Sequence, residues 1–144
     1  IITVGKGVDG EFYVLADHTT KGTPDQWARQ AAIAFYSAKA DHIIIEVNQG
    51  GDLNEAVLRT VDPDLPIRKV HATRGKRIRA EPVSALSEQH RVHLVGNHQD
   101  LEDELTGWSP ESADSPDRLD AFVWAMTALM TGRTIAPAAA IMTT

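Results

Sequence analysis

The chain has 144 residues, a net charge of −6 and a hydrophobic content of 42%, which are ordinary values for one soluble domain. It has no cysteine, which excludes disulfides and thiolate metal sites, and it has no apolar run near the ~20 residues that a membrane helix needs. The acidic balance argues against broad nucleic-acid binding, and together these features favour a cytoplasmic protein that does not contact a membrane.

The first third of the chain predicts a hairpin, a helix and a buried strand. Strands over 2–5 and 11–17 flank an Asp-Gly turn, which is a strong hairpin signal. A helix over 24–40 should begin with Thr23 as its N-cap and proline at its first position. The β-branched run over 42–47 then predicts a strand buried on both faces.

The remainder alternates between helices and strands. The pattern predicts helices over 52–59, 76–89, 100–105 and 116–131, and strands over 67–72 and 91–96. Pro82 should disturb the first part of its helix. This order predicts an α/β fold with a mixed sheet in one domain over residues 1–133, followed by a loosely ordered tail over 134–144.

Glu46 is the first candidate site residue, because it ends the predicted buried strand. Open α/β sheets place their ligands at such strand ends, and an unpaired charge there is costly. We therefore expect Glu46 to meet a metal, a cation or backbone donors, unless the strand has already reached solvent. The residues 48–51 that follow either bind an anion at a helix N-terminus or form an ordinary turn.

The segment SPDRLDA supplies two more acids. Asp117 and Asp120 are three residues apart on a predicted helix, so they share one face, and the rest of that helix is apolar nearly all round. Two acids opening a buried helix suggest metal ligation. Asp117 could instead cap the helix, and Asp120 could pair near Arg118, with Arg133 or with water.

Basic residues are concentrated between positions 68 and 79, a window that holds six of the fourteen in the chain. Four of them, in TRGKRIRAEP, form a candidate DNA-phosphate surface on an otherwise acidic protein: Arg74, Lys76, Arg77 and Arg79. A solvated helix face is the alternative. The histidines lack zinc-site spacing, and the chain has no Walker A or GxGxxG motif.

Taken together, these segments resemble a known family. EVNQGGDLNEAVLRTVDPDLPIRKVHATRGKRIRAEPVSAL, EQHRVHLVG, LEDEL and SPDRLDAFVWAMTALM are similar to the large subunit of tailed-phage terminases, including those of prophages and gene transfer agents. The resemblance spans nearly the whole chain, in order and with similar gaps. It is to the C-terminal nuclease half, and the ATPase motor with its Walker A loop is not part of this sequence.

The resemblance implies a ribonuclease H-like fold, with a mixed β-sheet flanked by helices. It also implies an endonuclease that cuts concatemeric double-stranded DNA at the start and end of packaging, using two Mg²⁺ or Mn²⁺ ions held by acids. The implied partners are double-stranded DNA, the terminase small subunit, the portal or procapsid, and the ATPase domain of the same full-length protein. The implied location is the cytoplasm of a bacterial host.

Site residues follow from the same resemblance. Glu46 matches the second-strand carboxylate of the family, and Asp117 and Asp120 match the two acids of its D-x-x-D-A pattern, as catalytic residues and metal ligands. Lys76 and Arg79 match basic residues that would face DNA near the cut.

One departure concerns the first strand of the family, which carries an aspartate that bridges both metals. This chain is expected to begin just after that strand and to lack it. Asp9 lies in the predicted hairpin turn, and Asp17, at a strand end, is a candidate substitute. We therefore expect weak or no cleavage by this chain.

Two other functions stay open at this point. One is a non-catalytic module that grips DNA or docks on the portal through the basic strip. The other is a different ribonuclease H-like nuclease, of the resolvase or transposase type, which a preference for branched DNA would reveal.

Overall fold

The fold is an α/β sandwich with a mixed sheet, as the sequence predicts. A computed structural model describes residues 1–47, 53–72, 75–109, 116–132 and 138–143. Within these ranges the chain forms β1 (Ile2–Lys6), β2 (Phe12–Asp17), α1 (Pro24–Ala38), β3 (His42–Glu46), α2 (Leu53–Val61), β4 (Ile67–Val70), α3 (Lys76–Glu88), β5 (Val92–Leu94), α4 (Gln99–Gly107), α5 (Asp117–Thr131) and β6 (Ala138–Thr143).

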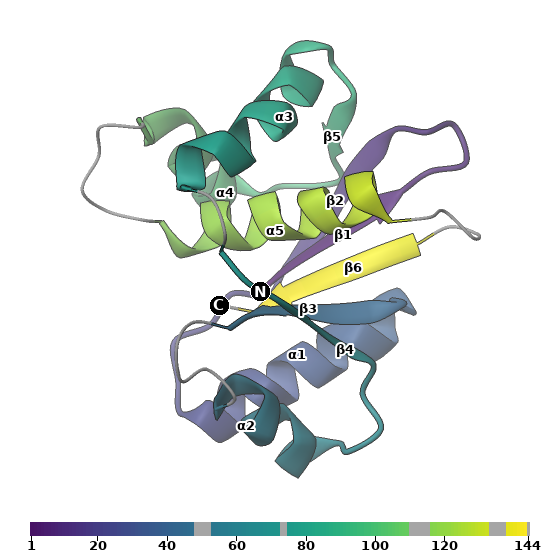
Figure 1. Cartoon of the computed structure of the whole chain (residues 1–144), viewed down its shortest axis with the longest axis vertical. Helices are drawn as coiled ribbons and strands as arrows, with labels where there is room; N and C mark the ends of the chain where they lie inside the picture. The colour runs from purple at the N-terminus through teal and green to yellow at the C-terminus, as the bar shows by residue number, and fades with distance from the viewer. Residues whose placement is uncertain (48–52, 73–74, 110–115, 133–137, 144) are drawn as a thin grey trace.

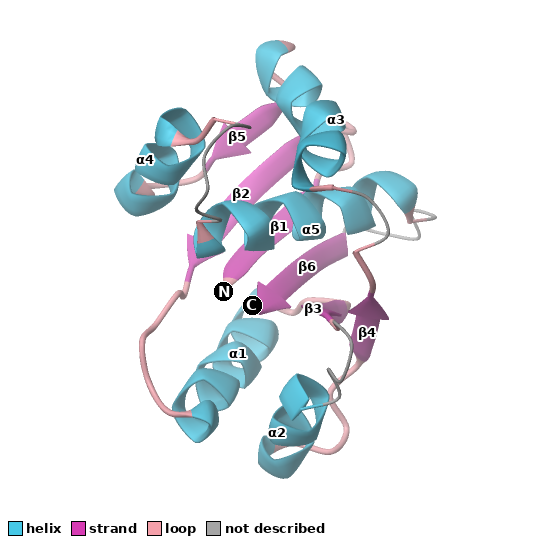
Figure 2. Cartoon of the chain, turned by 60° about the vertical axis from the view of Figure 1, so that its left-hand side comes forward, coloured by secondary structure: helices cyan, strands magenta, loops and turns pink. Residues whose placement is uncertain are grey.

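The strands form one sheet in the order β4-β3-β6-β1-β2-β5 (Figure 2). β1 runs antiparallel to both of its neighbours, β2 and β6. The other neighbouring pairs are parallel. β1 thus runs against the other five strands, which all point in one direction.

Helices cover both faces of the sheet. α1 and α2 lie on one face, and α3, α4 and α5 lie on the other (Figure 1). Each face has its own hydrophobic core, and β3 contributes to both. Ile43 and Ile45 pack with α1 and α2, whereas Ile44 packs in the core that contains α5. Because side chains alternate along a strand, Glu46 faces the same layer as Ile44.

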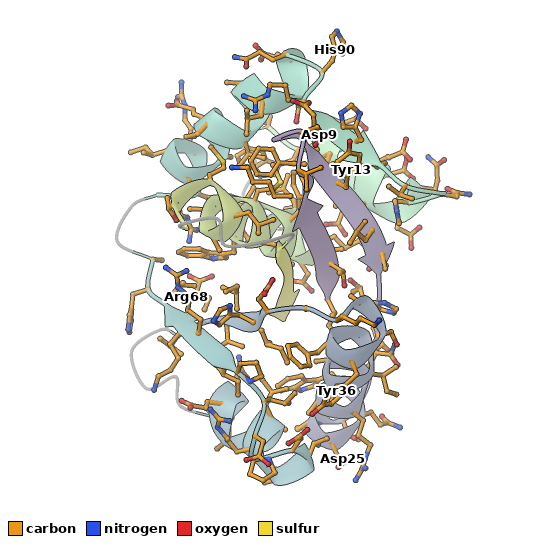
Figure 3. All side chains as sticks on the ribbon, turned by 90° about the vertical axis from the view of Figure 1, so that its right-hand side faces the viewer. Asp9, Tyr13, Asp25, Tyr36, Arg68 and His90 are labelled. Carbon is orange, nitrogen blue, oxygen red and sulfur yellow. The ribbon has the colours of Figure 1, made fainter. Side chains whose placement is uncertain are left out.

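Local signals in the first part of the chain form as predicted. Thr23 caps α1 in a capping box with Gln26, and Pro24 takes the first helical turn. The hairpin turn between β1 and β2 places Gly10 at φ +83°. Asp9 lies in this turn and accepts a 2.6 Å hydrogen bond from the Tyr13 hydroxyl, so both side chains sit at the hairpin tip (Figure 3).

Two segments differ from expectation. α3 continues through Pro82, although that residue has no N–H to donate within the helix. Residues 138–143, expected within a loosely ordered tail, form β6 between β1 and β3. A strand in that slot has a partner for its backbone groups on both sides, which offsets the weak strand preference of its alanines. None of the described helices is long and apolar enough to cross a membrane.

Candidate active site

Glu46 lies at the end of β3, under helix α5. The indole Nε1–H of Trp124 donates a 2.8 Å hydrogen bond to Glu46 Oε2. Arg79 Nη1, from the first turn of α3, lies 3.7 Å from Glu46 Oε1. The carboxylate that ends this buried strand therefore has one neutral donor and one cation, each from a different helix.

Arg79 is held between that carboxylate and an aromatic ring. Its guanidinium carbon lies 4.3 Å from the centroid of the Trp124 ring, within the range of a cation–π contact. The Arg79 side chain is only 14% exposed. Its Nε and Nη1 atoms are buried and have no hydrogen-bond partner among the described residues. The Arg79 guanidinium is thus held between two groups while two of its nitrogen atoms lack a hydrogen-bond acceptor in the described part of the chain.

Asp120 and Lys76 form a second pair beside the first. Lys76 Nζ lies 3.0 Å from Asp120 Oδ2, and the two side chains are 16% and 19% exposed. Lys76 also lies over the Trp108 ring, 5.5 Å from its centroid. Lys76 and Arg79 are three residues apart on α3, so one helix face carries both cations toward the two acids.

Spacing along α5 shows how far Asp117 and Asp120, the two acids of SPDRLDA, lie from Trp124. A helix rises about 1.5 Å per residue, so Asp120 lies about 6 Å along the axis from Trp124, and Asp117 about 10 Å. Asp117 opens the helix and is exposed to solvent. Along the helix axis, Asp120 is therefore nearer than Asp117 to Trp124, the residue that bonds Glu46.

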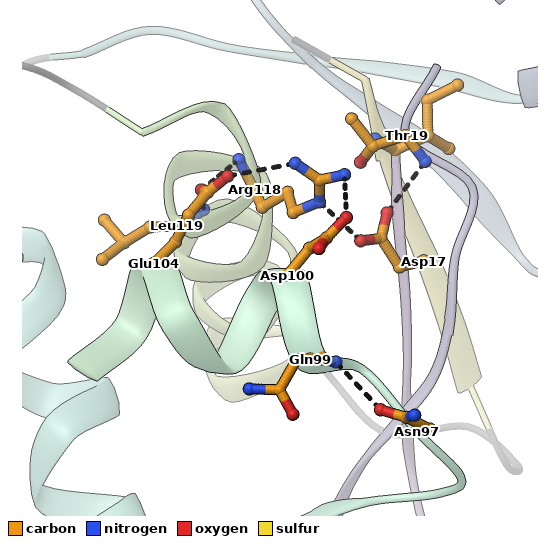
Figure 4. Close-up of polar contacts among 9 residues, drawn as sticks. Asp17, Thr19, Asn97, Gln99, Asp100, Glu104, Arg118 and Leu119 are labelled. Atoms are coloured by element: carbon orange, nitrogen blue, oxygen red, sulfur yellow. Dashed lines mark hydrogen bonds and ion pairs between the residues drawn. The ribbon is translucent and has the colours of Figure 1, made fainter. Parts of the chain in front are cut away.

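Arg118 lies in the same first turn of α5 as Asp117 and Asp120 and forms a separate cluster. Its guanidinium donates to three carboxylates: Asp17 at 2.7 Å, Asp100 at 3.0 Å and Glu104 at 3.2 Å (Figure 4). Glu104 also accepts the backbone N–H groups of Arg118 and Leu119, at 2.9 and 3.1 Å. Glu104 thereby satisfies two of the free donors that open α5.

Asp17 is committed to this cluster. Burial alone would raise the pKa of the Asp17 carboxyl, but hydrogen bonds from Thr19 and Arg118 outweigh burial and lower the pKa below its ordinary 3.8. The sheet order also separates Asp17 from Glu46 by three strand spacings, roughly 14 Å. Such a distance is too long for one ion to bridge both carboxylates, so this structure does not support Asp17 as the substitute ligand.

The four residues predicted to bind DNA differ in where their side chains lie. Lys76 and Arg79 turn inward to the acids. Arg77 faces solvent and pairs with Glu81 on its own helix at 3.4 Å. Arg74 lies outside the described residues, as do residues 48–51, expected to form either an anion-binding helix N-terminus or an ordinary turn.

The chemistry of the described donors suits one Mg²⁺ or Mn²⁺ ion, which commonly binds through one or two carboxylates and waters, but their number falls short of a two-metal centre. Glu46 and Asp120 offer hard oxygen ligands, which these ions prefer. Across the described residues, however, no group of three or more histidine, cysteine, aspartate or glutamate side chains comes close enough to hold a metal ion. Each of the two acids is paired with a cation instead.

Sequence reasoning missed the two tryptophans of this site and the role of Arg118. Trp124 reads as one more apolar residue of a buried helix, yet its position four residues after Asp120 puts both on one face of α5. That spacing is the signal that could have identified it. Trp108 and Arg118 have no comparable signal, because their partners come from other elements.

Comparison with known families decides the class of this chain. A family model described as a terminase RNaseH-like domain matches residues 1–129. The chain belongs to this family. A search of curated proteins and a search of solved structures each gave no match.

Membership agrees with the structure and with the resemblance drawn from the motifs. The terminase RNaseH-like domain is a nuclease-type module of the DNA-packaging terminase, and the mixed sheet flanked by helices is consistent with its fold. The match includes β3, the first turn of α3 and most of α5, which together carry both ion pairs of the site.

Proposed function

We propose that this terminase RNaseH-like domain is a metal-dependent endonuclease that cuts concatemeric double-stranded DNA during phage packaging. The observation that carries the proposal is the meeting of Glu46 and Asp120 with the basic first turn of α3. Phosphodiester hydrolysis needs both elements: carboxylates for the reacting water or a cofactor, and cations for the anionic strand.

Glu46, Asp120 and the exposed Asp117 are the residues that would hold the cofactor, Mg²⁺ or Mn²⁺. When bound, such an ion supplies charge neutralisation at the phosphate and an activated water. Trp124 keeps the Glu46 carboxylate oriented through its hydrogen bond. Lys76 and Arg79 would contact phosphate oxygens next to the cut, and Arg77, which faces solvent, would extend the basic surface.

We expect the chain on its own to cut slowly. The strand next to β3 is β6, and its sequence AAAIMT contains no acid. The described carboxylates near Glu46 are therefore fewer than a two-metal centre requires. The proposed partners are those implied by the resemblance: the terminase small subunit, the portal or procapsid, and the ATPase domain of the full-length protein, in the cytoplasm of the host bacterium.

The direct test is Mn²⁺-dependent nicking of supercoiled plasmid by the purified chain. Glu46→Gln keeps the shape and the acceptor for Trp124 but removes the charge, so nicking should be lost. Glu81→Gln removes an exposed acid of α3 and serves as the matched control. Nicking by the Glu46→Gln variant at the rate of the unmodified chain would refute the proposal.

The non-catalytic DNA-binding or docking module is the second candidate. It is favoured by one observation, namely that cations already neutralise Glu46 and Asp120. In that case the unmodified chain binds duplex DNA without nicking it at any Mn²⁺ concentration, and Glu46→Gln leaves its DNA affinity unchanged.

A further inference from the structure

Two sets of residues that were expected to bind different ligands bind each other in this structure. The acids Glu46 and Asp120 were expected to hold a metal, and the bases Lys76 and Arg79 were expected to hold DNA phosphates. Instead Lys76 Nζ lies 3.0 Å from Asp120 Oδ2, and Arg79 Nη1 lies 3.7 Å from Glu46 Oε1. Two positive and two negative charges thus balance at the centre of the site.

We propose that the first turn of α3 is an exchangeable counter-ion, so that a divalent cation and DNA phosphates bind this site cooperatively. A phosphate that attracts Lys76 and Arg79 releases Asp120 and Glu46 for the cation. A cation on the acids releases the two bases for phosphate. This inference rests on the proposed function, because it requires one site to receive both ligands.

Competition for the same oxygens is the first physical reason. Asp120 Oδ2 is in contact with an ammonium group, which occupies a lone-pair direction that a metal would use. A divalent ion at that place would also meet the repulsion of two nearby cations. Because all four side chains are between 14% and 21% exposed, solvent screens these charges only in part.

The incomplete bonding of Arg79 is the second reason. Its 3.7 Å approach to Glu46 is longer than a hydrogen bond, and its Nε and Nη1 have no acceptor among the described residues. Phosphate oxygens accept from guanidinium groups through short, charge-assisted bonds. Exchange of Glu46 for phosphate would therefore satisfy donors that the resting arrangement leaves unused.

Trp124 can hold the Glu46 carboxylate in place while its cation partner changes. Its Nε1–H donates to Glu46 Oε2, the oxygen opposite the one that faces Arg79. When Arg79 leaves, Glu46 keeps this bond and presents Oε1. Reciprocity of linkage then requires that DNA strengthen cation binding by the same factor by which the cation strengthens DNA binding.

Mn²⁺ affinity without DNA is the first measurement, made on the full chain by electron paramagnetic resonance of free Mn²⁺. Lys76→Gln and Arg79→Gln should each bind Mn²⁺ about 5-fold more tightly or better, near the lower end of usual coupling. Arg77→Gln removes the same charge from the same helical turn without touching the acids, and should change the Mn²⁺ affinity less than about 2-fold. Thermal unfolding of each variant shows whether it is folded. If only one of Lys76→Gln and Arg79→Gln folds, that variant alone tests the proposal.

The affinity for a fluorescein-labelled duplex, with and without Ca²⁺, is the second measurement. Ca²⁺ should increase the affinity of the unmodified chain for the duplex, although Ca²⁺ also screens the charges of DNA and would by itself weaken binding. In Glu46→Gln this increase should be absent. Equal Mn²⁺ affinities for Lys76→Gln, Arg79→Gln and Arg77→Gln would overturn the counter-ion exchange even if the chain cuts DNA. Failure of the unmodified chain to bind either ligand would overturn the proposed function as well.

Discussion

Helix α5 contributes a residue to each of two charged clusters that differ in bonding: Arg118 to one and Asp120 to the other. The Arg118 cluster joins Arg118 to Asp17, Asp100 and Glu104, with distances of 2.7 to 3.2 Å and two backbone N–H groups bonded to Glu104. The α3 counter-ion pairs, Lys76–Asp120 and Arg79–Glu46, have distances of 3.0 and 3.7 Å and leave Arg79 donors unused. The first cluster is built as a clamp, the second as a contact that can open.

Perturbed pKa values mark the clamp. Burial alone would lower the pKa of Arg118, but hydrogen bonds to Asp17 and Glu104 outweigh burial and raise it. The pKa of Asp17 is lowered in turn. A shifted pKa is often used to find functional residues, yet the shifts of Arg118 and Asp17 arise within a structural ion-pair network. The incompletely bonded cation, rather than the shifted pKa, points to the site.

Breaking the clamp should have the largest effect. Arg118→Met keeps the aliphatic stem but leaves Asp17 and Glu104, which are 14% and 22% exposed, without their cation. We expect the free energy of unfolding in urea to fall by about 3 kcal/mol. Arg91→Met is the control, because Arg91 pairs with Glu11 at the surface, and it should cost about 1 kcal/mol or less. Equal losses in the two variants would mean that the Arg118 cluster is no more than a surface ion pair.

The hydrogen bond of Trp124 should give the next largest effect. Trp124→Phe removes the donor to Glu46 and should lower the free energy of unfolding by about 2 kcal/mol. Trp108→Phe removes the same atoms, but the Trp108 Nε1 is buried without a partner among the described residues, so it should cost less than about 1 kcal/mol. Chemical denaturation of both variants measures the difference, and a larger loss for Trp108→Phe would contradict this assignment.

Elements whose cause is local could be predicted from the sequence. The capping box at Thr23, the β-branched run of β3 and the apolar surround of α5 each hold their information within one segment, and each formed where the pattern placed it. Membership of the terminase RNaseH-like domain family was also predicted, because several motifs agreed in order and spacing.

The pairing of charges could not be predicted, because it depends on how helices from separate segments pack. Asp120 was expected to hold a metal or, as the alternative, to pair near Arg118, with Arg133 or with water. Neither expectation included Lys76, which Asp120 meets across the α3–α5 contact. β6 was missed for a related reason. Its alanines have weak strand preference, and only the open positions beside β1 and β3 make a strand there favourable.

Acid sensitivity offers the smallest and most specific separation of the two clusters. Because the pKa of Asp17 is lower in the folded chain than its ordinary 3.8, its contribution to stability is complete above that value and is lost as the pH falls below it. Asp17→Asn should therefore be less stable than the unmodified chain at pH 6, by about 1–2 kcal/mol, with a difference that narrows as the pH falls below 3.8.

Asp25→Asn is the control. It removes an exposed carboxyl whose pKa is also lowered, by a surface hydrogen bond from Arg29, and its stability should stay close to that of the unmodified chain at every pH. Urea unfolding at several pH values measures both differences. A difference for Asp17→Asn that does not change with pH would show that packing of Asp17, and not its charge, holds the clamp together.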